Sequence, residues 1–96
     1  MNIPDHILRG KRSKADKSSA ILKFVILNLA AQHTDRASVR SLAKRVGLEH
    51  STISIYIRRG QFSPAAAERI VRELAVTDVK PDHLINPLAL LSASPG

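Results

Sequence analysis

The chain has no cysteine and very few aromatic residues: its 96 residues include one tyrosine, two phenylalanines and no tryptophan. Without cysteine it can form neither a disulfide framework nor a reactive thiolate, which fits a reducing cytoplasm. Because aromatic rings are scarce, aliphatic side chains and alanines must fill the core. The length suits one small domain and excludes barrel or doubly wound enzyme folds, which need roughly 150 to 250 residues.

Residue patterns typical of enzymes and metal sites are also missing. The four histidines lie far apart in the sequence, with no carboxylate or cysteine at ligand spacing, and the four glycines are dispersed. The sequence therefore indicates no metal site and no glycine loop that cradles phosphate. It also lacks the G-x-S-x-G pattern of a nucleophile elbow. We expect no enzymatic activity, no cofactor and no metal ion.

A long apolar run is absent as well. Residues 21–31 form the most apolar stretch, near half of the roughly 20 residues that a membrane-spanning helix needs, and Lys23 and Asn28 interrupt it. The basic residues 11–17 in front of it resemble the start of a signal peptide, but the pattern of residues 39–59 argues against export. We expect a buried core helix, no membrane association and a cytoplasmic location.

Positive charge dominates and is unevenly distributed. Fifteen lysines and arginines stand against eight acidic residues, which gives a net charge of +7. Residues 1–23 contain six basic and two acidic residues, residues 36–59 six and one, and residues 60–96 three and four. Two basic segments and a near-neutral tail favour a polyanionic partner on one side of the molecule. The alternative is a basic surface that serves only solubility.

Apolar periodicity predicts a helical domain over residues 18–88. Residues 1–17 show no such periodicity, so we expect a flexible basic arm there. The first helix is expected to begin at Ser18 or Ser19 and to end near Gln32. Its apolar residues, which recur at i, i+3, i+4 and i+7, are Leu22, Val25, Ile26 and Leu29.

Capping residues mark the next two helices. Ser38 is a good N-cap for a second helix that ends near Val46, where Gly47 supplies a left-handed turn. The third helix is expected over His50–Arg59, and Gly60 follows it in the same role as Gly47.

A fourth helix begins with Ser63 as N-cap and Pro64 at its first position, and it runs to Leu74. Its expected core face consists of Ala67, Ile70, Val71 and Leu74. The proline-containing remainder leaves room for one short helical turn before a frayed tail over residues 89–96. Four or five short helices with short connections and no alternating stretch predict an all-α domain.

The segment 39–59, VRSLAKRVGLEHSTISIYIRR, has the pattern of a helix-turn-helix. Two helices that cross steeply through a tight turn need a small residue at their contact, a glycine in the turn and apolar residues facing a shared core. Ala43 and Gly47 supply the first two. The inward apolar positions are Leu42, Val46, Leu48, Ile53 and Tyr56.

Residues 46–60, VGLEHSTISIYIRRG, resemble the turn, recognition helix and closing glycine of Cro-like phage repressors. The stretches QFSPAAAERIVREL and VKPDHLINP are similar to small prophage-encoded Cro-like proteins often labelled YdaS-type antitoxins. The resemblance covers residues 18–87 and implies a lambda-repressor-like all-α fold, with four to five short helices around the helix-turn-helix. It also implies a nucleoid-associated, sequence-specific repressor that binds a pseudo-palindromic DNA operator as a homodimer.

Base-reading residues are expected at the N-terminal end of the third helix, because the second helix of such a pair lies in the major groove. The outward candidates are Glu49, His50, Ser51, Ser54 and Ile55. Imidazole, hydroxyl and carboxylate groups form hydrogen bonds with base edges, and isoleucine packs on a thymine methyl. Alternatively, Ser51 and Glu49 only stabilise the start of the helix, and Ile55 is half-buried.

Other polar residues are expected to meet phosphates and to set affinity and its salt dependence. The candidates in the domain are Ser38, Arg40, Lys44, Arg45, Arg58 and Arg59. Those in the arm, which follow the neighbouring minor groove or backbone if the arm binds DNA, are Lys11, Arg12, Lys14 and Lys17. Alternatively, single members of the first group are merely solvated and the arm is a solubility tail.

Two other functions stay open. RNA binding is disfavoured, because single-stranded RNA is usually held by aromatic stacking and Tyr56, one of few aromatic residues, is expected in the core. The stronger alternative is an antitoxin-like protein or polymerase adaptor that binds another protein through the apolar residues 84–91. The same segment can instead form the homodimer seam or cap the core.

Overall fold

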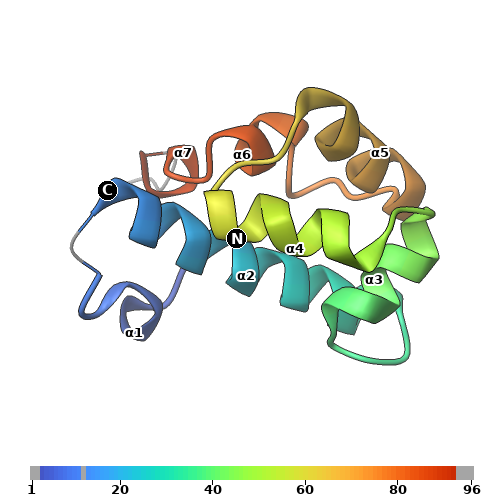
Figure 1. Ribbon diagram of the computed structural model, residues 1–96, viewed down its shortest axis with the longest axis horizontal. Coiled ribbons are helices and arrows are strands. Elements are labelled where there is room, and N and C mark those ends of the chain that lie inside the picture. Colours follow the sequence, from blue (N-terminus) through green and yellow to red (C-terminus); the bar gives the residue numbers. More distant parts are fainter. Residues whose placement is uncertain (1–2, 12, 93–96) are drawn as a thin grey trace.

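The computed structural model describes residues 3–11 and 13–92, and over them its regular secondary structure consists of α-helices alone (Figure 1). Its helices are α1 (Asp5–Leu8), α2 (Lys14–His33), α3 (Val39–Val46), α4 (His50–Arg59), α5 (Pro64–Leu74), α6 (Pro81–Ile85) and α7 (Ala89–Ser92). The all-α prediction is confirmed. The described residues hold seven helices and not four or five, because single-turn helices form near both ends of the chain.

The long helix α2 begins at Lys14, one turn earlier than Ser18, so the expected start is wrong. Ser13 is the N-cap, and its Oγ accepts a hydrogen bond of 3.0 Å from the N–H of Asp16. Asp16 also places a negative charge at the positive end of the helix dipole. Because the added turn is polar and largely exposed, apolar periodicity carried no signal for it.

The segment before α2 is packed in the structure, at variance with the expected flexible arm. Helix α1 contacts α2, and Ile3 and Leu8 pack against the core. The segment contains too few apolar residues to show periodicity. They are nevertheless enough to hold one helical turn against α2. Arg12, a member of the expected arm, lies outside the described residues.

Helices α3, α4 and α5 end and begin where their capping residues predicted. The hydroxyl Oγ of Ser38 accepts a hydrogen bond from the N–H of Ser41 at 3.1 Å, and that of Ser63 accepts one from Ala66 at 3.2 Å. Gly47 and Gly60 end α3 and α4 with φ of +77° and +81°, the left-handed conformation expected of them.

The core lies where α2 meets α3 and α4, and α5 and α6 close it from the far side (Figure 1). Every residue of the expected apolar face of α2 is fully buried. On α5, Ala67, Ile70 and Leu74 are buried as expected, whereas Val71 is half-buried. The ring of Phe62 packs on that of Tyr56 with centroids 5.1 Å apart, which joins α4 to the segment before α5.

The C-terminal segment covers one end of the core. Leu84 and Leu90 are buried, and the carbonyl of Leu84 accepts a hydrogen bond of 2.9 Å from the N–H of Phe62. Leu91 is 37% exposed and Leu88 is half-buried. Of the roles open for residues 84–91, core capping is therefore filled by Leu84 and Leu90. The expected frayed tail is helical over Ala89–Ser92, and residues 93–96 lie outside the described residues.

Candidate nucleic-acid interface

Helices α3 and α4 are joined by a turn of three residues that the backbone itself closes. The N–H groups of Gly47 and Leu48 both donate to the carbonyl of Ala43, at 2.9 and 3.0 Å. Ala43 is 2% exposed and Leu48 is half-buried against the core, so the small residue lies inside the contact as its position in the sequence predicted. The two helices therefore leave the turn at a fixed angle.

A side chain of α5 also holds this turn. Nε of Arg69 donates a hydrogen bond of 2.7 Å to the carbonyl of Val46, the last residue of α3. A Cβ added to Gly47 would lie 2.7 Å from Nη2 of Arg69. The guanidinium satisfies a carbonyl that the end of α3 leaves without a helical partner, and its charge suits the negative end of the helix dipole. The sequence gives no signal for this contact, because its partners are 23 residues apart.

The outer side of α4 is a ridge of four exposed residues. Ser51 and Ile55 are one turn apart, and Arg58 and Arg59 follow them on the same side. The side chain of Ile55 is 44% exposed, whereas Ile53 on the inward side is fully buried. The interpretation of Ile55 as half-buried is therefore wrong, and an aliphatic group stands in solvent in the middle of a polar face.

The N-terminal end of α4 is open to solvent. Glu49 is its N-cap residue, but the carboxylate makes no capping hydrogen bond. His50 and Ser51 occupy the first two helical positions and are exposed. Because Ser51 lies inside the helix and not at the N-cap, it does not cap α4. Ser54, the remaining base-reading candidate, is half-buried beside α2.

The charged candidates of the domain are exposed on two helices. Arg40 and Lys44 lie one turn apart on α3 and share a face, whereas Arg45 points to a different side. Ser38 differs from them, because its hydroxyl caps α3 and lies 2.9 Å from Oγ of Ser41.

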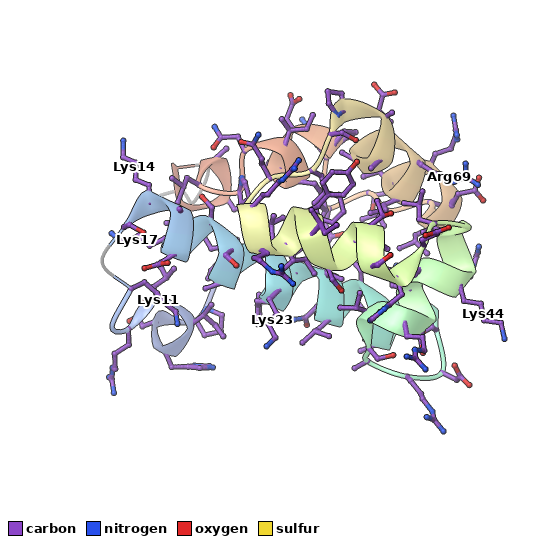
Figure 2. All side chains as sticks on the ribbon, in the orientation of Figure 1. Lys11, Lys14, Lys17, Lys23, Lys44 and Arg69 are labelled. Atoms are coloured by element: carbon purple, nitrogen blue, oxygen red, sulfur yellow. The ribbon has the colours of Figure 1, made fainter. Side chains whose placement is uncertain are left out.

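The lysines of the N-terminal segment gather at the opposite end of the molecule from Lys44 (Figure 2). Lys11 and Lys14 are exposed and Lys17 is half-buried. Lys23, which the sequence patterns did not single out, lies between these two groups in the same view. The labelled lysines are thus spread along the long dimension of the molecule, which measures 33 Å.

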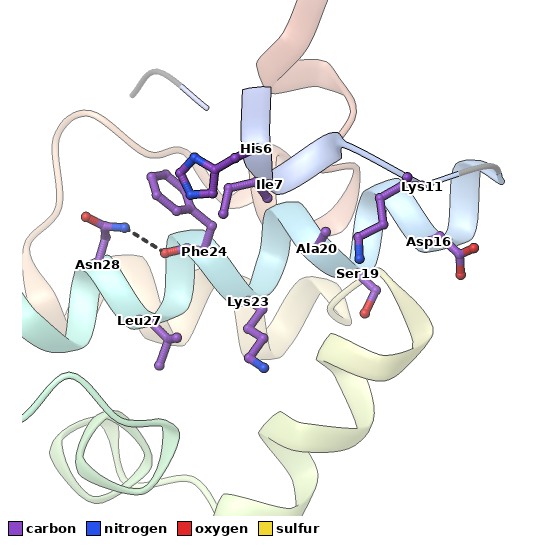
Figure 3. A pocket seen from close by; sticks show the side chains of 11 residues that line it. His6, Ile7, Lys11, Asp16, Ser19, Ala20, Lys23, Phe24, Leu27 and Asn28 are labelled. Carbon is purple, nitrogen blue, oxygen red and sulfur yellow. Dashed lines mark hydrogen bonds between the residues drawn. The ribbon is translucent and has the colours of Figure 1, made fainter. Parts of the chain in front are cut away.

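A groove of about 860 Å³ lies alongside α1 and α2 (Figure 3). The residues that line it include the apolar Ile7, Phe24 and Leu27 and the charged Lys11, Lys23 and Asp16. Over the described ranges 3–11 and 13–92, no three histidine, cysteine or acidic side chains come together in a way that could hold a metal ion. No helix in that part of the chain is long and apolar enough to cross a membrane.

Comparisons of the chain with protein-family models, with curated proteins and with solved structures find no match. The residues and their arrangement are therefore what indicate a function. The arrangement brings Glu49, His50, Ser51 and Ile55 to one open end and side of α4, and basic residues of α3 and α4 to exposed positions around them.

Proposed function

We propose that the protein is a Cro-like transcriptional repressor that binds a pseudo-palindromic DNA operator as a homodimer. The observation that carries the proposal is the pair α3 and α4, joined by a closed three-residue turn, with the outer side of α4 exposed. In a helix-turn-helix the second helix enters the major groove and presents its N-terminal residues to base edges. Such a protein acts by blocking access of RNA polymerase to a promoter, in the cytoplasm and on the nucleoid.

The chemistry of the ridge and of the N-terminal end of α4 supports direct reading of bases. His50, Ser51 and the carboxylate of Glu49 offer hydrogen-bonding groups in solvent, and Ile55 offers an aliphatic surface for a thymine methyl. An exposed isoleucine is unfavourable in water, so a partner that covers it gains apolar burial.

The exposed arginines and lysines of α3 and α4 support contacts with the phosphate backbone of DNA. Arg40 and Lys44 on α3, with Arg58 and Arg59 at the end of α4, carry charge without base-specific geometry, the usual role of phosphate contacts. Neutralising several phosphates makes affinity depend steeply on salt. We expect a dimer because one recognition helix contacts only a few base pairs. Distinguishing an operator from the rest of a genome needs two half-sites, each bound by one protomer.

The test is retention of genomic fragments. The protein is incubated with a fragmented library of its own genome at about 150 mM salt, near physiological ionic strength, and the retained fragments are sequenced. We expect enrichment of a two-fold-related motif whose half-sites are about one helical turn apart. A variant with both His50→Ala and Ser51→Ala is the control, because its phosphate contacts are intact and its enrichment should fall.

A second function, that of an antitoxin-like protein or polymerase adaptor, is favoured by the apolar side chains left open near the C-terminus. Leu91 is exposed, and Ile85 and Leu88 are half-buried against the core. If no sequence motif is enriched among the retained genomic fragments relative to random fragments, the positive charge provides only non-specific binding. This second function is then preferred.

A further inference from the structure

A second, smaller hollow lies beside the ridge on α4. It has a volume of about 310 Å³ and is lined by Ser19, Lys23, Val39, Ser54, Ile57 and Arg58. These residues come from α2, from the first position of α3 and from the middle and end of α4. The hollow therefore lies where the helix-turn-helix pair meets a helix outside that pair.

Four of the six residues that line the hollow can interact with an anion. Lys23 and Arg58 are exposed and carry positive charge, Ser19 and Ser54 are half-buried and bear hydroxyl groups, and the apolar Val39 and Ile57 complete the lining. Hydroxyls and cationic side chains are common partners of DNA phosphate oxygens. No acidic residue is among the residues that line it. The volume is about ten times the ~30 Å³ share of one water molecule, so a phosphate group with attached waters has room.

A helix N-terminus adds to this potential. Val39 is the first helical residue of α3, a helix of eight residues whose cap, Ser38, takes up the N–H of Ser41. Because Val39 lines the hollow, the N-terminal end of α3, where the helix dipole is positive, lies beside it. Three sources of positive potential from three helices converge on one hollow.

We infer that this hollow binds one phosphate of the DNA backbone and that Lys23 is its phosphate contact on α2, outside the helix-turn-helix pair. The inference rests on the proposed function and deepens it. Ser54 and Arg58 belong to α4, so a major groove that receives α4 brings the bordering strand to its side. The phosphate held there fixes how deeply and at what angle α4 enters the groove, because backbone contacts set register.

The larger groove between α1 and α2 is a weaker anion site, although it shares Ser19 and Lys23 with the hollow. Asp16 lines it, together with the apolar side chains of Ile7, Phe24 and Leu27 (Figure 3). A carboxylate beside a phosphate is unfavourable. The proposed contact is therefore confined to the hollow between α2 and α4.

The experiment measures affinity for a 30-base-pair duplex of random sequence at several salt concentrations, which needs no knowledge of the operator because phosphate contacts act in non-specific binding. Lys23→Gln is compared with Lys80→Gln, a matched loss of one exposed lysine just before α6. We expect Lys23→Gln to lower the salt slope by about 0.9 per bound protomer, or about 1.8 for the proposed dimer, and to weaken binding about fivefold per protomer near 150 mM salt. Lys80→Gln should leave both nearly unchanged, and Lys23→Arg should retain wild-type behaviour.

A backbone scan distinguishes a contact from a general effect of charge. Single phosphates of an operator duplex from the genomic selection, on which the protein has one register, are replaced by neutral methylphosphonates, one position at a time. Replacement at one position in each half-site should weaken binding of the wild-type protein and leave binding of Lys23→Gln unaffected, because that variant has already lost the contact. Equal salt slopes for Lys23→Gln and Lys80→Gln would overturn the inference while the proposed function stands. A scan in which no phosphate position distinguishes the wild type from Lys23→Gln would do the same. A wild-type protein that binds no duplex at any salt concentration overturns the proposed function and this inference together.

Discussion

At the scale of single residues, Gly60 is the glycine whose added Cβ would meet atoms that cannot easily move aside, because they belong to or lie next to the backbone of α2. Its φ is +81°, and an added Cβ would lie 2.9 Å from Cβ of Ser18 and 3.3 Å from the carbonyl oxygen of Ala15. We expect Gly60→Ala to lower the free energy of unfolding by about 2 to 4 kcal/mol, through left-handed backbone strain and overpacking together. Urea denaturation measures the loss.

Gly10 is the matched control for that change. It has the same φ of +81°, yet an added Cβ would meet nothing within 4 Å. Gly10→Ala should therefore show only the backbone strain, about 1 kcal/mol. Equal losses for the two variants would show that the contact between Gly60 and α2 does not matter.

Ala75 presents the opposite case, a residue with a side chain where glycine fits better. It ends α5 with φ of +52° and is the only non-glycine residue with positive φ among the described residues. Ala75→Gly should raise the free energy of unfolding by up to about 1 kcal/mol, because relief of the left-handed strain exceeds the added entropy of the unfolded chain. A lower midpoint of thermal unfolding than that of the wild type would contradict this.

Base reading makes a prediction at the same scale. Replacing both His50 and Ser51 by Ala should remove about 1 to 3 kcal/mol of discrimination between the best site and its single-base variants. Binding constants for a panel of such duplexes measure it. The control is Arg58→Ala, which should weaken all duplexes alike and lower the salt slope. If the double variant keeps the wild-type ratios between sites, His50 and Ser51 do not read bases.

At the scale of elements, Arg69 joins α5 to the turn between α3 and α4. Arg69→Met keeps much of the side-chain volume and removes the donor to the carbonyl of Val46. We expect a loss of about 1 to 3 kcal/mol in stability, the usual effect of leaving one partner of a hydrogen bond unsatisfied. Arg72→Met, an exposed arginine on the same helix, is the control and should change stability little. Equal unfolding midpoints for the two variants would count against this role.

Much of the element order was predictable, because local chemistry decided it. Ser38, Gly47, Gly60 and Ser63 each fix a helix end through their own backbone or hydroxyl, so α3, α4 and α5 begin or end where these residues stand. The start of α2 was not predictable from apolar periodicity, since its first turn is polar. Helix α1 escaped prediction because its packing on α2 stabilises a turn too short to form alone.

The candidate site divides in the same way. The exposure of Ser51, Arg58 and Arg59 follows from helical spacing once the inward face of α4 is known. The contact made by Arg69 and the role proposed for Lys23 do not follow from helical spacing. Each depends on which helices become neighbours in the folded chain. A lysine inside an apolar run shows no local sign that it will stand beside the end of another helix.

At the scale of the whole molecule, the proposed dimer makes a prediction about Leu91. This side chain is 37% exposed, next to the half-buried Leu88 and outside the buried core. Leu91→Asp should therefore leave the unfolding midpoint nearly unchanged and shift the monomer–dimer equilibrium toward monomer in sedimentation experiments. Leu90→Asp is the contrasting variant and should unfold the protein, because Leu90 is 6% exposed. An unchanged dimer in Leu91→Asp would place the seam elsewhere.

The close packing of Gly60 on Ser18 has a consequence for the proposed DNA binding. It holds the end of α4 against α2, which fixes the spacing between the ridge on α4 and the lysine on α2. For a protein that binds DNA as proposed, the spacing between groove floor and bordering strand is then set by the protein. Duplexes whose grooves are naturally wider or narrower must deform to match, and they differ in how much energy that takes. Under the proposed function, Gly60 thereby contributes to discrimination between sequences at base pairs that the protein does not touch.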